Sequence, residues 1–186
     1  MPFDEIVFEA EDKMQKAVDV LANEFKGVRT GRASPGLVEG VKVDYYGAPT
    51  PLKALASITC PEPRLIMIKP FDASSISAIE KSIQKSDIGL NPQSDGKIIR
   101  LAVPPLSDER RKQMAKQVKE LGEKAKVSIR NVRRDANQTA EEEEKKKILS
   151  EDEKKKTREE SDRLTKQYEG KVQESVDKKT KEVMEG

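Results

Sequence analysis

The last 81 residues of the chain contain no proline and only three glycines. Proline breaks helices and glycine weakens them, so this stretch is predicted to be helical. Apolar or small residues recur in it at steps of three and four, the period of one face of a helix. We therefore expect a long helix from Pro105 to Leu149 with one buried stripe, which needs partner helices because propensity alone seldom holds a helix in water. The stripe is Met114, Val118, Leu121, Ala125, Ile129, Val132 and Ala136.

Capping signals divide this helical region in two. Ser107 is suited to cap the start of the long helix, and Ser150 followed three residues later by Glu153 matches a capping box. A further helix is therefore predicted over 151–184. Residues 141–160 carry many charges and few apolar side chains, so we expect them to form the solvated tip of a hairpin where two helices meet without a third.

The N-terminal segment is also predicted to be an amphipathic helix, from Phe3 to Val28. Its apolar residues recur with a period near 3.5 and need a partner surface. They include Val7, Ala10, Met14, Leu21, Phe25 and Val28.

Residues 31–104 differ in composition from the rest of the chain. They hold 16 charged residues in 74, whereas the other 112 residues hold 54, and nine of the ten prolines lie between Pro35 and Pro105. Short runs rich in β-branched and aromatic residues indicate strands. Isoleucines at helical spacing indicate a helix over 74–86, with Gly89 placed to cap its end. The predicted strands are 41–46, 54–60, 64–69 and 97–103.

The predicted fold class is therefore α+β with two domains. Residues 1–30 and 105–186 are expected to form a long three-helix bundle, and residues 31–104 a small inserted β/α/β domain. Two connections join the parts, and each contains glycine or proline, so both are candidate hinges; a rigid elbow at the same place is the alternative. The candidate hinge residues are Gly31, Pro35, Gly36, Pro104 and Pro105.

Composition excludes several classes of function. Histidine is absent and there is a single cysteine, Cys60. Histidine-dependent catalysis, histidine-ligated metals and an internal disulfide are thereby excluded, and Cys60 is expected to be a buried, inert thiol. The chain has no phosphate-cradling glycine loop, so we predict neither an enzyme nor a bound cofactor or metal. A signal sequence and a membrane-spanning stretch are also missing, which predicts a cytoplasmic protein.

Three arginines lie within five residues in the string R-N-V-R-R-D-A-N, which begins at Arg130. Lysine dominates the exposed positions before it, and the change to arginine points to a specific contact, because the planar guanidinium fits phosphate oxygens. The alternative is that Arg130 and Arg133 are solvated and paired with acids such as Glu123 or Asp135. Helix geometry alone leaves both open. We expect this string to lie where the bundle thins from three helices to two.

Five motifs in order along the whole chain resemble the ribosome recycling factor family. Their combination is specific, although each one alone is short. They are V-R-T-G-R-A-S-P at Val28–Pro35, D-Y-Y-G-A-P-T-P at Asp44–Pro51, S-D-I-G-L-N-P at Ser86–Pro92, P-P-L-S-D-E-R-R-K at Pro104–Lys112 and I-R-N-V-R-R-D-A-N at Ile129–Asn137.

The resemblance implies an L-shaped, two-domain translation factor without catalytic residues. Its helical domain would bind 23S ribosomal RNA of the large subunit after termination. Together with elongation factor G and GTP, it would split the ribosome and release messenger RNA and deacylated tRNA. We expect this protein to be a monomer, without DNA or membrane partners. Carried over residue by residue, the resemblance places RNA contacts on Arg29, Arg32, Arg130, Arg133 and Arg134.

A second class of function is a long-helix holdase chaperone that binds unfolded chains. Such a protein also couples helical hairpins to a small β body, and it exposes apolar residues at the hairpin tip. The segment 141–160 offers charges instead, apart from Ile148 and Leu149. The translation factor is therefore the leading hypothesis.

Overall fold

The structure is a computed structural model that describes all 186 residues. Contacts divide the chain into two compact units. The first comprises Met1–Phe25 and Ala115–Lys181, and the second comprises Lys26–Met114 and Glu182–Gly186. No helix combines the length and the apolar composition that crossing a lipid bilayer requires.

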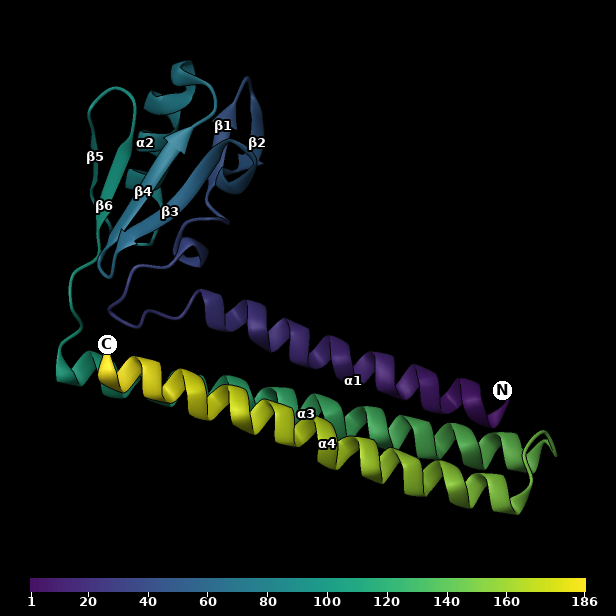
Figure 1. Cartoon of the computed structure of the whole chain (residues 1–186). Helices are drawn as coiled ribbons and strands as arrows, with labels where there is room; N and C mark the ends of the chain where they lie inside the picture. Colours follow the sequence, from purple (N-terminus) through teal and green to yellow (C-terminus); the bar gives the residue numbers. More distant parts are fainter. The chain divides into compact units, whose positions relative to one another are not determined.

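The first unit is built from three long helices, α1 (Phe3–Lys26), α3 (Asp108–Lys145) and α4 (Glu151–Glu185), which run side by side (Figure 1). α3 has 38 residues, about 57 Å at 1.5 Å per residue. Its predicted stripe is confirmed, because the stripe residues are buried or half-buried. α4 contributes a matching stripe. Buried members on these two helices include Val118, Ala125, Ile129, Leu164, Tyr168 and Val172.

Both predicted caps are confirmed. The Ser107 hydroxyl accepts a hydrogen bond from the backbone N–H of Arg110 at 3.3 Å. At the start of α4, the Ser150 N–H donates to a Glu153 carboxylate oxygen at 2.8 Å, and the Glu153 N–H donates to the Ser150 hydroxyl at 3.2 Å. These reciprocal bonds satisfy backbone donors that have no partner inside the helix.

α3 ends at Lys145, four residues before the predicted Leu149. The Ile148 N–H donates to the Glu143 carbonyl at 2.9 Å, and the Lys147 N–H donates to the Glu144 carbonyl at 2.9 Å. This pair of bonds is a Schellman motif, and it places Lys147 in the left-handed region at φ +61°. A lysine thus occupies a position that glycine usually fills.

The expectation that the bundle thins near Arg130 is wrong. Ile6 and Ala10 of α1 form one apolar cluster with Ala136, Ala140 and Leu149. The terminal amine of the chain also forms an ion pair with a carboxylate oxygen beside that cluster, on Glu143. α1 therefore packs along α3 almost to the tip.

Most of the predicted hairpin tip, 141–160, is exposed, but Glu143, Leu149 and Thr157 are buried within it. α4 has almost no apolar residues in its first turns, and in its first half it buries the hydroxyl-bearing residues Thr157, Ser161 and Thr165. Each of these hydroxyls donates to a backbone carbonyl three or four residues earlier, at 2.7 to 3.0 Å. Small, internally bonded side chains allow α4 to pack closely without an apolar stripe.

The second unit contains a four-stranded antiparallel sheet in the order β3, β4, β6, β5, together with a separate β1–β2 hairpin and the helix α2 (Ile76–Lys85). Three short 3-10 turns join these elements. The predicted α+β class with an inserted small domain is thus confirmed. The strands are β1 (Lys42–Tyr45), β2 (Ala48–Pro51), β3 (Ala56–Glu62), β4 (Leu65–Pro70), β5 (Pro92–Ser94) and β6 (Ile99–Ala102).

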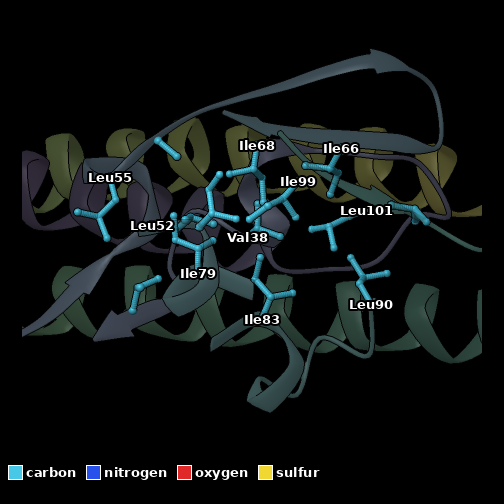
Figure 2. Packing of buried hydrophobic residues seen from close by; sticks show 14 residues of the cluster. Val38, Leu52, Leu55, Ile66, Ile68, Ile79, Ile83, Leu90, Ile99 and Leu101 are labelled. Carbon is cyan, nitrogen blue, oxygen red and sulfur yellow. The ribbon is translucent and has the colours of Figure 1, made fainter. Parts of the chain in front are cut away.

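The core of this unit lies between α2 and the sheet (Figure 2). Ile79 and Ile83 of α2 point toward residues of β4 and β6, and all are almost completely buried. Ile66 pairs with Leu101, and Ile68 with Ile99, so alternate residues of the two central strands face the core. Cys60 packs against this core, half-buried, and burial raises the pKa of its thiol.

Three local predictions for this unit need correction. The sequence does not predict β2 and β5, because proline is rare in strands. Both are found where it is tolerated, β2 in a two-stranded hairpin and β5 at a sheet edge. Gly89 does not cap α2: the helix ends at Lys85, and the hydroxyl of its C-cap residue Ser86 donates to the Ile83 carbonyl at 2.6 Å.

The boundaries between the two units fall inside the three long helices. The sequence instead places them between residues 30 and 31 and between residues 104 and 105. Tight packing around Gly31 explains why the helix ends belong with the second unit. A Cβ on Gly31 would lie 3.4 Å from the backbone of both Leu106 and Gly186. The Arg111 guanidinium also donates to the Gly186 carbonyl at 2.8 Å. The first turns of α3 and the last of α4 are thereby tied to the loop after α1.

Candidate nucleic-acid interface

Arg130 joins α3 to α4 through its guanidinium. Its Nε lies 2.7 Å from Glu169 Oε1, and its Nη1 lies 3.2 Å from Glu123 Oε1. Hydrogen bonds from Glu169 and then Glu123 raise the pKa of Arg130. The predicted pairing with Glu123 is therefore observed, while Asp135 makes no side-chain ion pair in the structure.

Arg133 and Arg134 lie one turn further along α3 and border an open concavity of about 600 Å³. Arg133 Nη1 is 3.4 Å from Asp162 Oδ1, and the two side chains are partly exposed, at 36% and 49%. The Arg134 side chain is exposed and has no protein partner. The full lining is Arg133, Arg134, Asn137, Gln138, Glu141, Arg158 and Asp162.

These ion pairs do not prevent Arg130 and Arg133 from contacting a phosphate. Exposed pairs contribute only about 0 to 1 kcal/mol each. A phosphate oxygen that offers a comparable or better bidentate contact can replace a carboxylate at that small cost. The concavity thus presents three guanidinium groups, from Arg133, Arg134 and Arg158, against the carboxylates of Glu141 and Asp162.

Arg29 and Arg32 belong to the second unit, in the loop that follows α1. The Arg32 side chain is exposed, whereas Arg29 is half-buried. The guanidinium of Arg29 lies against Gly89, where a Cβ would come within 3.4 Å of its Nη2 atom. Gly89, with φ +65°, therefore provides both the backbone turn and the space beside this arginine. The structure brings Arg133 and Arg134 together and places Arg29 and Arg32 in a separate unit.

The five candidate hinge residues all lie in the second unit. Gly31 has φ +78°, a value that L-residues rarely adopt. Pro35 opens a 3-10 turn capped by the Ser34 hydroxyl, and Gly36 lies so close to Lys26 that a Cβ would be 3.0 Å from it. Gly31 and Gly36 thus have close neighbours at their Cβ positions. Pro104 and Pro105 lie in the irregular segment before α3.

Sequence reasoning missed two arginines near these groups, Arg158 and Arg110. Arg158 faces Glu141 across the hairpin at 3.5 Å. The sequence contained a signal for this ion pair, because Glu141 and Arg158 lie at similar distances on either side of the predicted turn near Ser150. Arg110 lines a cavity with Arg29, and nothing in the sequence indicates that these two distant residues meet.

Long packed helices, an inserted α+β unit and concentrated guanidinium groups together describe a protein whose sites bind rather than catalyse. Its similarity to known protein families and solved structures places the chain among non-enzymatic translation factors. A family profile described as ribosome recycling factor matches residues 21–184. The chain belongs to the ribosome recycling factor family.

Similar proteins cover the chain almost completely. The ribosome-recycling factor of Nitratidesulfovibrio vulgaris is 49% identical over 185 residues, which is 100% of both chains. That of Rhodopirellula baltica is 61% identical over 140 residues, 75% of each chain.

Two solved structures resemble this fold. One is a solution structure of ribosome recycling factor, with TM-score 0.80, 41% identity and coverage of 100% of this chain and 99% of that chain. The other contains models for T. thermophilus ribosome recycling factor and E. coli elongation factor G bound to the E. coli post-termination complex. Its TM-score is 0.70, with 38% identity and coverage of 99% of this chain and 100% of that chain.

Proposed function

We propose that this protein binds the post-termination ribosome and, with elongation factor G and GTP, separates the subunits. The messenger RNA and the deacylated tRNA are released in the same process. Family membership over residues 21–184 is the observation that carries this proposal. The similar T. thermophilus protein, placed on the post-termination complex with elongation factor G, supports it. We infer that the protein acts in the cytoplasm, because the ribosome is its proposed partner, and we expect it to act as a monomer.

The proposed RNA partner is 23S ribosomal RNA of the large subunit. Arg130, Arg133 and Arg134 on α3 are proposed contacts of the three-helix unit, and Arg29 and Arg32 those of the second unit. Support comes from the guanidinium geometry, which suits phosphate oxygens, and from the weak pairing that holds Arg133 to Asp162.

We also propose that the second unit receives the action of elongation factor G. The connections that contain Gly31, Pro35, Gly36, Pro104 and Pro105 would then serve as hinges. The positive φ of Gly31 supports this role, because backbone changes concentrate at glycine. A disulfide that restricts both connections should leave subunit binding intact and abolish recycling; full recycling by the restricted protein would contradict the hinge.

The decisive experiment mixes the purified protein with post-termination ribosomes, elongation factor G and GTP. Light scattering should report subunit separation, and omission of the protein, of elongation factor G or of GTP should each abolish it. GTP turnover should require the partner factor, since the chain has no nucleotide-binding loop. Subunit separation that is unchanged without this protein would refute the proposal.

The holdase alternative makes a different prediction at the hairpin tip. It requires a continuous apolar surface there. Ile148 is 53% exposed, but Leu149 is buried in the cluster with α1. Suppression of the aggregation of an unfolded client, without any binding to ribosomal subunits, would favour the chaperone.

A further inference from the structure

An open slot lies between α1 and α3 within the first unit. Its volume is about 380 Å³, within the range of small-molecule sites, about 300 to 1,000 Å³. α1 lines it from Lys13 to Glu24, and α3 lines it from Leu121 to Val132. Either stretch runs roughly 16 Å along its helix at 1.5 Å per residue. We name this elongated cavity the α1–α3 slot.

The floor of the α1–α3 slot is apolar surface that the helices leave incompletely covered. Leu121 and Val132 belong to the predicted buried stripe of α3, yet both are only half-buried. On α1, Val20 lines the same slot and is 56% exposed. The walls also contain small side chains, Ala17 on α1 and Ser128 on α3. Small side chains on both walls leave a hollow that the bundle itself does not fill.

The two ends of the slot differ in charge. Lys13 and Lys16 line the end nearer the hairpin tip, three residues apart on one face of α1. At the other end, the charge of Glu24 on α1 is offset by that of Lys124 on α3. The slot therefore combines an apolar floor with one positively charged end.

Both lysines at that end are available to an external anion. Lys13 Nζ lies 3.2 Å from Glu9 Oε2, and Lys16 Nζ lies 2.6 Å from Asp12 Oδ2. Exposed pairs of this kind contribute little, so a ligand carboxylate can replace the acid at small cost. Neither Glu9 nor Asp12 lines the slot.

The size of the apolar surface favours a small ligand over a protein partner. A stable protein interface buries about 800 Å² on each side. Among the large apolar side chains that line the slot, only Val20 is largely exposed. A long, narrow hollow of this kind fits a single flexible alkyl chain, and its charged end requires an anionic group at one terminus of that chain.

We propose that the α1–α3 slot binds one free fatty acid, with its carboxylate between Lys13 and Lys16 and its alkyl chain over Val20 toward Leu121. Burial of the methylenes supplies the affinity, and the two ammonium groups fix the direction of the chain. The inference does not rest on the proposed function, because the slot contains none of the arginines assigned to RNA.

The test titrates the full chain with dodecanoate, below the concentration at which it forms micelles, in an isothermal calorimeter. Removing two methylenes from the ligand should weaken binding about tenfold. Dodecyltrimethylammonium, which has the same chain and the opposite charge, should bind far more weakly. In NMR spectra, the methyl signals of Val20, Leu121 and Val132 should shift. Absence of binding, equal binding of the cation, or shifts confined to other residues would overturn the inference.

Variants locate the two parts of the ligand. Ala17→Phe should fill the slot and abolish binding, whereas Ala22→Phe, at an exposed position of α1 outside the slot, should bind like the parent. Lys13→Gln and Lys16→Gln should each weaken binding about fivefold, the scale of a partly exposed ion pair. Lys119→Gln is their control, because Lys119 is exposed on α3 and does not line the slot. Parental affinity of Ala17→Phe would contradict the site.

Thermal unfolding checks that the variants are folded and provides a second measure of binding. Saturating dodecanoate should raise the Tm of the parent and of Ala22→Phe but not that of Ala17→Phe; an equal rise in all three would refute the slot. If Ala17→Phe does not fold, Ser128→Leu fills the slot from an exposed position of α3 and should lose binding instead. Binding to phosphatidylglycerol vesicles without binding to monomeric dodecanoate would also refute the inference, because the surface would then attach to a membrane.

Discussion

Gly122 of α3 lies directly against Val176 of α4. A Cβ at residue 122 would approach Val176 Cγ2 to 2.3 Å, a separation that real contacts do not show. Glycine in a helix interior costs about 1 kcal/mol relative to alanine. Its presence here is explained by the close approach of the two helices, because no other residue leaves enough space for the valine.

Gly122→Ala should destabilise the protein by about 1 to 3 kcal/mol despite its better helix propensity, since overpacking forces the β-branched Val176 to move. Urea unfolding followed by circular dichroism measures the change. Gly170→Ala on α4 is the control: nothing lies within 4 Å of its Cβ position, so it should stabilise by about 0.5 to 1 kcal/mol. In a Val176→Ala background the clash should be relieved, so Gly122→Ala should cost less stability there than in the parent. An equal loss of stability in both backgrounds would show that the contact with Val176 is not the cause of the destabilisation.

Lys147→Gly should stabilise the turn between α3 and α4. Lys147 has φ +61° at the position after the α3 C-cap, where glycine avoids the steric cost of the left-handed region. We expect a gain of about 0.5 to 1 kcal/mol in the free energy of unfolding. Lys145→Gly, two residues earlier and inside the helix, should lose a similar amount. A loss in both variants would contradict the Schellman assignment.

The capping box of Ser150 and Glu153 should make stability depend on pH. Backbone and side-chain hydrogen bonds from Ser150 lower the pKa of Glu153 below its ordinary value of 4.5. Because the folded pKa is the lower one, the stabilisation is complete above pH 4.5 and is lost as the pH falls through the folded pKa. Glu153→Gln should flatten this part of the stability curve, obtained from urea midpoints between pH 2 and 7.

At neutral pH, Ser150→Ala should cost about 1 kcal/mol through the lost cap. It should also reduce the same pH dependence, because its hydroxyl and N–H hold the carboxylate. An unchanged pH profile in both variants would show that the box does not stabilise the helix.

Arg133→Ala should weaken binding to the large subunit by about 1 to 3 kcal/mol and flatten its salt dependence. Its thermal stability should change within about 0.5 kcal/mol, because the pair with Asp162 is exposed. Asp162→Asn provides an opposite test: it frees Arg133 from its competing carboxylate and should tighten binding. Val132→Asp, beside Arg133 on the packed face of α3, should unfold the helices instead. Parental affinity of Arg133→Ala across the salt series would leave Arg133 as a solvated arginine.

Local sequence determined most of the secondary structure. The 3.6-residue period, Ser107 and the Ser150–Glu153 box predicted the helices of the first unit within a few residues, because caps and amphipathic stripes act between neighbours along the chain. The change in composition after Thr30 likewise predicted the inserted α+β unit. β2 and β5 escaped prediction, because their prolines disfavour strands locally and only pairing with a neighbour strand stabilises them.

The partners of the charged side chains were decided by tertiary structure. The sequence by itself predicted that the arginines at 130, 133 and 134 matter, but not that two of them face acids of α4. Neither did it predict that Arg29 and Arg110, 81 residues apart, border one cavity. Helix period determines which face a residue occupies, whereas the partner depends on the register between distant elements. That register is set by packing contacts such as Gly122 against Val176, which have no signature in the local sequence.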